Sequence, residues 1–141
     1  MNRRWSPLGC ACLLLFAACH HQGPAVGDEA VKRAVIGEFE AIKALDARTV
    51  FDLETKQCQR FISEPEIRKG MSVFRHSTFR DSRGWTLRFD AVDVDGKDPP
   101  SAEVTTTFLN RSGDEVLWKD VPGPESWVRE SGEWKHDCDS E

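Results

Sequence analysis

The feature that most constrains this chain is a change in the spacing of its apolar residues near Trp85. Before this point, apolar residues recur at intervals of three and four, which is typical of amphipathic helices. From Trp85 onward they alternate with polar residues, which is typical of strands that bury one face. This order predicts an α+β fold, in which N-terminal helices pack on a curved antiparallel sheet of about four strands.

Three helices are expected in the first half of the chain. Asp28 can cap a helix that extends to about Asp46, and a shorter helix is predicted over Ala47–Leu53. The third follows Ser63-Glu64-Pro65-Glu66, which has the Ser-x-x-Glu form of a capping box, and ends near His76. The first helix is expected to bury five apolar residues: Val31, Val35, Phe39, Ile42 and Leu45.

The predicted sheet begins with a bent strand. Leu87 and Phe89 have one parity, whereas Val92 and Val94 have the other, and such a slip indicates a β-bulge. The elements expected after this strand are a loop at 95–101, a strand at 102–108, a turn at 111–113 and a strand at 116–121.

The chain ends in a predicted hairpin over residues 126–138. We expect a three-residue loop, Glu130-Ser131-Gly132, with Gly132 in the left-handed conformation. This register pairs Val128 with Trp134, whereas a two-residue Ser131-Gly132 loop would pair Val128 with Lys135. The apolar pair favours the three-residue loop.

The predicted register assigns the hairpin side chains to two faces. Trp134, His136 and Cys138 are expected to face inward with Val128. Trp127 and Arg129 would then face outward, where an exposed tryptophan is a candidate anchor for a partner protein. The alternative is that the stem of a neighbouring lysine covers this tryptophan.

The N-terminus is typical of a bacterial secretory signal. Arg3 and Arg4 precede an apolar run over 8–18, which is shorter than the roughly 20 residues that cross a bilayer as a helix. Phe16-Ala17-Ala18-Cys19 resembles a lipobox, although Leu is usual where this chain has Phe16. We expect removal of the signal peptide 1–18, lipidation of Cys19 and a tether over 19–27. The alternative is an ordinary cleaved signal and a soluble secreted protein.

This signal predicts a lipid-anchored domain on the extracytoplasmic face of a bacterial cell membrane. The net charge is −5, and it becomes more negative when Arg3 and Arg4 leave with the signal peptide. An acidic chain argues against nucleic acid as a partner and against direct adhesion to anionic lipids. Membrane attachment is therefore expected through the acyl chains.

The cysteines predict one disulfide. Removal of residues 1–18 and acylation of Cys19 leave Cys58 and Cys138, and an even remainder in an exported protein indicates a bond between them. The bond would close a loop of about 80 residues, for which the chain-entropy relation gives roughly 4 to 5 kcal/mol. The alternative is two unpaired buried thiols.

Helices before a curved meander, together with the ending Trp127-Val128-Arg129-Glu130-Ser131-Gly132-Glu133-Trp134-Lys135, resemble the nuclear transport factor 2 superfamily of α+β cones. The resemblance covers roughly residues 28–138, within an expected domain over 28–141. The hairpin, with cysteines after the helices and at the end of the last strand, is similar to small exported bacterial lipoproteins. It implies a bent sheet folded around a helix to form a conical cavity. Members include enzymes, ligand binders and interaction modules, so the fold does not decide the function.

The enzymatic alternative resembles ketosteroid isomerases and polyketide cyclases, which use the cone as an active site. Asp90 or Asp93 would be the base, with His76 or His136 as its partner. The chain has no tyrosine, which removes the hydrogen-bond donor that such isomerases use. No catalytic residue is therefore assigned. The sequence also lacks the spacings of known metal and cofactor motifs, so none is expected.

We therefore expect a non-catalytic envelope lipoprotein that binds either a small apolar ligand or a partner protein. A ligand would occupy the cone, and a partner would dock on the sheet or near Trp127 and Arg129. A homodimer is a further possibility, because many members of the superfamily pair through their sheets. The expected ligand-binding residues are Trp85, Phe89, Phe108, Trp118, Trp134 and His136.

Overall fold

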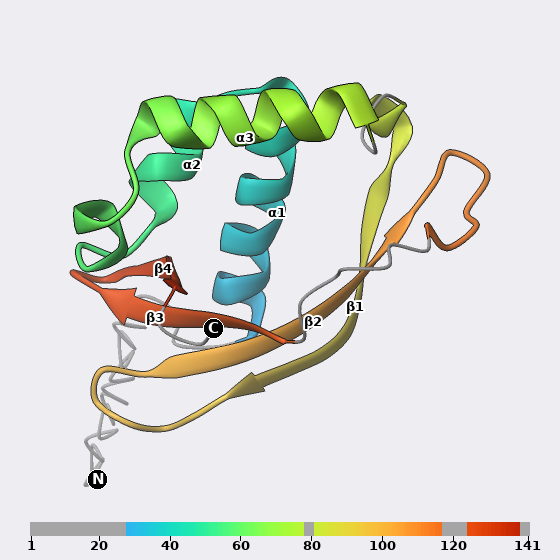
Figure 1. Ribbon diagram of the computed structural model, residues 1–141. Coiled ribbons are helices and arrows are strands. Elements are labelled where there is room, and N and C mark those ends of the chain that lie inside the picture. The colour runs from blue at the N-terminus through green and yellow to red at the C-terminus, as the bar shows by residue number, and fades with distance from the viewer. Residues whose placement is uncertain (1–27, 78–80, 117–123, 139–141) are drawn as a thin grey trace, which may run out of the picture.

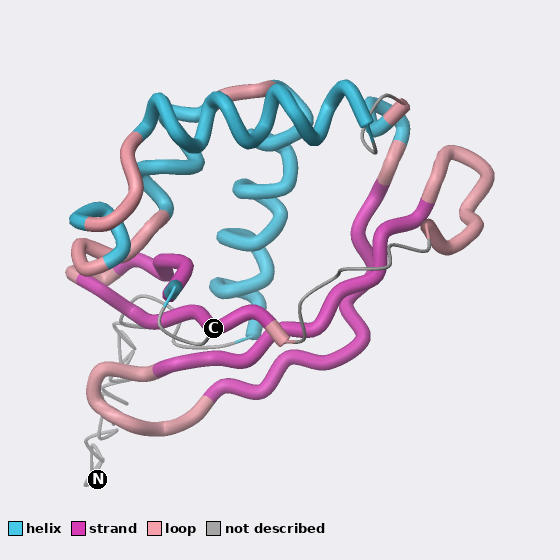
Figure 2. Tube along the Cα trace, in the orientation of Figure 1, coloured by secondary structure: helices cyan, strands magenta, loops and turns pink. Residues whose placement is uncertain are grey.

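The computed structural model describes residues 28–77, 81–116 and 124–138. The predicted signal peptide 1–18, Cys19, the tether 19–27 and Trp118 lie outside the described residues. Three α-helices pack against a four-stranded antiparallel sheet whose edge strands do not pair with each other (Figures 1 and 2). The α+β class predicted from the sequence is confirmed.

The first two helices follow the predicted spacing closely. Helix α1 spans Asp28–Ala44, and α2 spans Ala47–Leu53 as predicted. Helix α1 ends before Asp46 because Leu45 has a left-handed φ of 59°. Asp46 then caps α2, since its carboxylate accepts a hydrogen bond of 3.1 Å from the backbone N–H of Thr49.

Helix α3 spans Glu64–Ser77 and begins at the predicted capping box. The Glu66 carboxylate accepts hydrogen bonds from the backbone N–H and the hydroxyl of Ser63, both at 2.7 Å. A short 3-10 helix, η1 (Cys58–Arg60), connects α2 to α3, and another, η2 (Ser82–Gly84), precedes the sheet. Figure 1 shows α3 lying across the end of α1 that is farther from the sheet.

The sheet has the strand order β1-β2-β3-β4, and all neighbouring strands are antiparallel. The register between the first two strands shifts between Phe89 and Ala91, so the predicted bulge is confirmed with Asp90 as the extra residue. The bulge keeps Phe89 and Val92 on the face that packs against the core. The strands are β1 (Thr86–Val94), β2 (Ser101–Leu109), β3 (Glu125–Glu130) and β4 (Glu133–Asp137).

The predicted strand at 116–121 is described only at its start. Glu115 forms an isolated antiparallel bridge with Leu109, and the backbone N–H of Val116 donates a hydrogen bond of 2.9 Å to Phe108. Residues 117–123 lie outside the described residues.

Two main clusters form the core. One joins α1 to the sheet and contains Val31, Val35, Ala102, Val104, Trp127 and Trp134. The other joins the three helices and contains Ala41, Ala47, Val50, Ile67 and Met71. Because α1 contributes to both clusters, it holds the sheet and the outer helices together.

The predicted register of the final hairpin is wrong. The turn is the two-residue Ser131-Gly132 loop, with φ of 52° and 85°, and Val128 pairs with Lys135. Trp127 consequently pairs with His136, and it is 0% exposed rather than outward-facing. A shift of one residue exchanges the two faces of a strand, and burying a tryptophan removes more apolar surface from water than burying Val128.

The two cysteines predicted to pair are bonded in the structure. Cys58 in η1 and Cys138 after β4 form a disulfide with a Cα–Cα distance of 5.8 Å. The adjoining backbones are also linked, because the N–H of Thr55 donates a hydrogen bond of 3.0 Å to the carbonyl of His136. The segment after α2 is thereby held against the edge strand β4.

Candidate functional site

The interior of the predicted cone is nearly filled. Between α1 and the sheet lies a cavity of about 30 Å³, which is roughly the volume of one water molecule, whereas pockets for small molecules measure about 300 to 1,000 Å³. Aromatic packing accounts for much of the filling. The ring centroids of Phe39 and Phe108 are 5.3 Å apart, and those of Trp85 and Phe108 are 6.2 Å apart.

The expected ligand-binding residues occupy different environments. Trp134 is buried in the cluster between α1 and the sheet, and Phe89 packs against that cluster. Trp85 packs with Phe39, and Phe108 packs against this pair. Trp85 also lines a cleft beside the turn after β2, and Trp134 lines a pocket with Arg33 and Arg129. His136 lies between two carboxylates, and this environment is the candidate site.

The candidate site is a cluster of Glu38, Glu54 and His136. Nδ1 of His136 lies 3.3 Å from Oε1 of Glu38 and 3.4 Å from Oε1 of Glu54. Nδ1 is buried, but it makes no well-directed hydrogen bond, so these contacts are ion pairs without strong directionality. The imidazole also stacks on Trp127, with ring centroids 5.3 Å apart.

Three elements that are distant in the sequence bring this cluster together. Glu38 lies on α1 between Val35 and Phe39, on the side of the helix that faces the core. Glu54 ends α2 and forms a parallel bridge with His136 of β4. The disulfide to Cys138, two residues after the histidine, holds β4 in this position.

The cluster carries excess negative charge. Burial by itself lowers the pKa of His136, but Glu38 and Glu54 outweigh this effect and raise the pKa to about 11. Burial and the nearby Glu38 raise the pKa of Glu125, whereas His136 and the Trp127 indole act in the opposite direction. One imidazolium therefore faces two carboxylates, with the Glu125 carboxyl close by.

Sequence reasoning identified His136 as inward-facing but missed its two partners. One signal was present for Glu38, because it interrupts the apolar face of α1 three residues after Val35. Glu54 offered no comparable signal, because its position depends on the packing of the end of α2 against β4.

The residues considered for catalysis do not converge with His136. Asp90 accepts hydrogen bonds from Thr107 and from Nε of Arg88, and these contacts hold its pKa below the usual range. Asp93 is exposed on β1. His76 is exposed near the end of α3, where its Nδ1 lies 2.8 Å from the carbonyl of Ser72. The two aspartates considered as bases therefore do not pair with either histidine considered as their partner.

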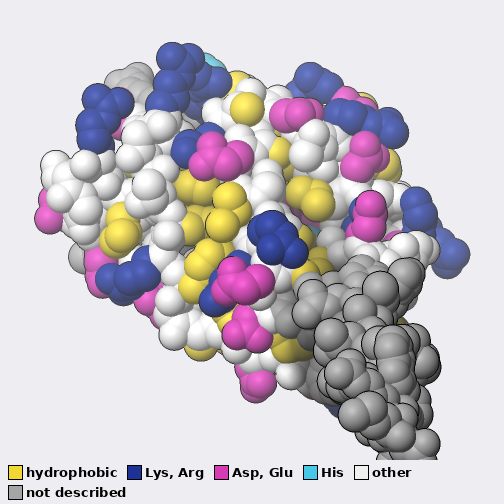
Figure 3. All heavy atoms as spheres, turned by 180° about the vertical axis from the view of Figure 1, so that it is seen from behind, with side chains coloured by type: hydrophobic (Ala, Val, Ile, Leu, Met, Phe, Trp, Pro, Cys, Tyr) yellow, Lys and Arg dark blue, Asp and Glu magenta, His cyan; other side chains and the backbone are white. Residues whose placement is uncertain are grey.

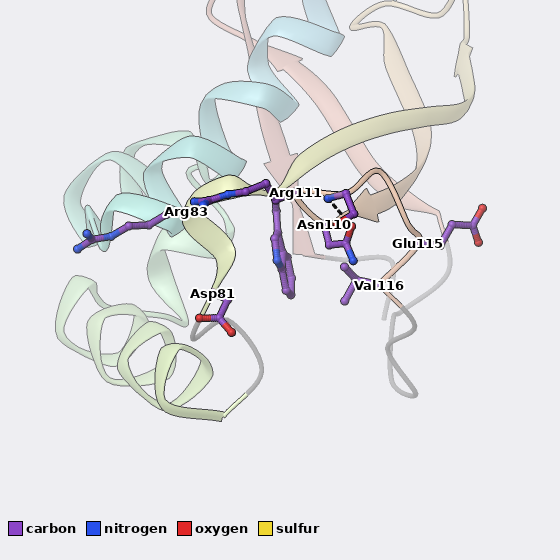
Figure 4. Close-up of a pocket in the computed structure, with 8 residues that line it drawn as sticks. Asp81, Arg83, Asn110, Arg111, Glu115 and Val116 are labelled. Atoms are coloured by element: carbon purple, nitrogen blue, oxygen red, sulfur yellow. Dashed lines mark hydrogen bonds between the residues drawn. The ribbon is translucent and has the colours of Figure 1, made fainter.

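A cleft of about 650 Å³ lies beside the turn after β2. Figure 4 shows that the side chains of Arg83 and Glu115 point away from each other rather than into a common centre. Trp85 forms an apolar wall, but the charged groups of Arg83 and Glu115 do not converge beside it. We therefore do not assign this cleft as the functional site.

The outer surface exposes several large apolar side chains near α3. Phe61, after η1, is 78% exposed, and Ile62 beside it is also exposed. Val73 and Phe74 are exposed on α3 and line a hollow of about 410 Å³ with Glu66, Lys69 and Gly70. On the face shown in Figure 3, acidic and basic side chains are interspersed around hydrophobic ones.

Within residues 28–77, 81–116 and 124–138, no helix is both long and apolar enough to cross a membrane. A comparison with known protein families finds no family model that matches the chain, and a comparison with curated protein sequences finds no match.

Proposed function

We propose that this chain is a lipid-anchored, extracytoplasmic domain that binds a partner protein through its outer surface and does not catalyse a reaction. The observation that carries this proposal is the filled interior between α1 and the sheet. A cavity of about 30 Å³ leaves room for about one water molecule. Binding by the described part of the domain must then use surfaces outside the cone.

The proposed fold family is the nuclear transport factor 2-like cone. Support comes from three helices followed by a curved sheet, with the N-terminal half of α1 packed against the sheet and a bulge in β1. In this family the same framework serves enzymes, carriers and interaction modules. The filled interior favours the interaction class for this chain.

The proposed membrane attachment rests on the lipobox-like Phe16-Ala17-Ala18-Cys19 segment. A lipid on Cys19 would place helix α1, which begins at Asp28, a short distance from the membrane. Mass spectrometry of the protein purified from its own membrane tests this attachment. We expect an acylated Cys19 as the first residue, and a mass without acyl chains would remove the anchor from the proposal.

The proposed docking surface is the hollow on α3 that Val73 and Phe74 line, and the exposed Phe61 and Ile62 before this helix are proposed as a second apolar contact. Large apolar side chains surrounded by charged groups are typical of protein interfaces, where the apolar centre contributes most of the affinity. A partner protein with a complementary apolar ridge fits this surface better than a lipid bilayer does, because Glu66 and Lys69 of opposite charge border the hollow. Trp127 is not part of this surface, because it is buried.

Site-directed photocrosslinking in the native membrane tests the proposed surface. A photoreactive amino acid would replace Phe61 or Val73, and replacement of the exposed Glu103 on β2 gives the control. We expect one discrete protein adduct from the two apolar positions and none from the control. Equal adducts from all three positions would contradict the proposal. A homodimer would appear as an adduct of twice the chain mass.

Native mass spectrometry of the gently extracted protein distinguishes the binding of a partner protein from the binding of a small apolar ligand. The proposal predicts a domain without a bound small molecule. A retained lipid-sized mass would instead favour a carrier and would contradict the inference drawn from the filled interior.

A further inference from the structure

We propose that Glu38, Glu54 and His136 bind a single divalent metal ion of the Zn²⁺ type. This site is independent of the proposed docking surface, because it lies between α1, the end of α2 and β4. One imidazole nitrogen and two carboxylate oxygens are donors that Zn²⁺ accepts in proteins.

The distances between the donor atoms fit a small tetrahedral ion. Ligand atoms around Zn²⁺, with bonds of about 2.0 to 2.1 Å, lie about 3.3 to 3.4 Å apart at the corners of a tetrahedron. Nδ1 of His136 lies 3.3 Å from the Glu38 oxygen and 3.4 Å from the Glu54 oxygen. All three donor atoms lie within 4.8 Å of one another, so a small rotation of a carboxylate completes the triangle.

The carboxylate side chains are largely buried, and the imidazole donor atom has no well-directed hydrogen bond. The Glu38 side chain is 9% exposed, and the Glu54 side chain is 11% exposed. The buried Nδ1 of His136 has no well-directed hydrogen-bond partner, and it faces both carboxylates. Buried polar groups usually have hydrogen-bond partners, so a buried nitrogen that faces two carboxylates without one points to a ligand.

The surrounding structure fixes the donors before a metal binds. Trp127 stacks on the imidazole and orients the ring. The hydrogen bond from Thr55 to the His136 carbonyl and the disulfide at Cys138 hold the strand against the end of α2. A metal would therefore bind without a large rearrangement, which favours affinity.

Charge supplies a further argument. Two largely buried carboxylates face one imidazole, so a divalent cation would balance their negative charge. With three protein ligands, a fourth position would remain for water.

Isothermal titration with ZnCl₂ tests the proposal. The tag-free full chain, with its disulfide intact and pretreated with a chelator, would carry alanine at Cys10, Cys12, Cys19, His20 and His21, because these residues could bind zinc elsewhere. We expect one Zn²⁺ per chain. Glu38→Gln and Glu54→Gln should each weaken binding at least tenfold. Glu40→Gln, an exposed change on the same helix, should leave it unaltered.

X-ray absorption of the zinc-loaded chain gives a second readout that does not depend on substitutions. We expect a first shell of nitrogen and oxygen at about 2.0 Å without sulfur. Absence of zinc binding by the unsubstituted site would overturn the proposal. Unchanged affinity in both glutamine variants, or a sulfur shell, would also overturn it. If Glu38→Gln fails to fold, the zinc affinity of Glu54→Gln and the absorption spectrum still test the proposal.

Discussion

Reduction of the Cys58–Cys138 disulfide should remove a large part of the stability of this domain. The bond joins η1 to the end of β4 across a separation of 80 residues. The chain-entropy relation for a loop of this length gives about 15 cal/mol/K, or about 4.5 kcal/mol at 25 °C. Because small domains have a free energy of unfolding of roughly 5 to 15 kcal/mol, the reduced protein should be only marginally folded.

Urea unfolding followed by tryptophan fluorescence, with and without a phosphine reductant, measures this effect. At a urea dependence of about 2 kcal/mol per molar, the expected loss lowers the midpoint by about 2 M. The control is the Cys58→Ala/Cys138→Ala variant, whose midpoint should not respond to the reductant. A loss below about 1 kcal/mol in the parent chain would refute the reasoning. It would mean that the contacts between η1 and β4 persist without the bond or that the unfolded chain is already compact.

Four further substitutions test other parts of the structure. The effects of the first three on the free energy of unfolding are measured by urea unfolding. Trp127→Ala should lower the free energy of unfolding by about 3 to 5 kcal/mol, because the indole is fully buried. Ser63→Ala removes the hydroxyl that donates to the Glu66 carboxylate at the start of α3 and should cost about 1 kcal/mol. Ser131→Asn should add about 0.5 kcal/mol, because asparagine tolerates the left-handed φ of 52° better than serine. Hydrogen bonds from Ser101 and Lys97 lower the pKa of Asp95, so its contribution to stability is present above pH of about 4 and is lost at lower pH. Asp95→Asn should reduce this acid dependence in a series of thermal melts.

Each of these expectations can fail in a defined way. If Trp127→Ala lowers the free energy of unfolding by less than about 0.5 kcal/mol, the result would favour an outward-facing Trp127, as the three-residue loop predicts. An unaltered Ser63→Ala variant would mean that the Ser63 hydroxyl does not stabilise α3. A destabilised Ser131→Asn variant would argue against the two-residue turn. Identical acid profiles for the parent and Asp95→Asn would remove the role assigned to the Asp95 hydrogen bonds.

Much of the fold could be predicted because its signals are local. The span Ala47–Leu53 and the capping box at Ser63 depend on residues within a few positions of each other. The bulge in β1 was visible as a change of parity between Phe89 and Val92, because alternation within one strand reports which face is buried.

The hairpin register shows where local reasoning ends. Two turns were compatible with Ser131 and Gly132, and the pairing of Val128 with Trp134 favoured the wrong one. The outcome depended on α1, which covers the inner face of the hairpin and provides the apolar surroundings for Trp127. The α1 residues that pack near Trp127 are more than 90 positions away in the chain, so a pattern within the hairpin cannot predict this packing.

The sequence by itself therefore determined the α+β class, the helices, the bulged first strand and the pair of cysteines that are bonded. Only the tertiary structure decided that the interior is filled, that Trp127 is buried and that Glu38, Glu54 and His136 meet. The physical reason is that periodicity and caps act along the chain, whereas the volume of a cavity and the convergence of charges depend on how separate elements pack.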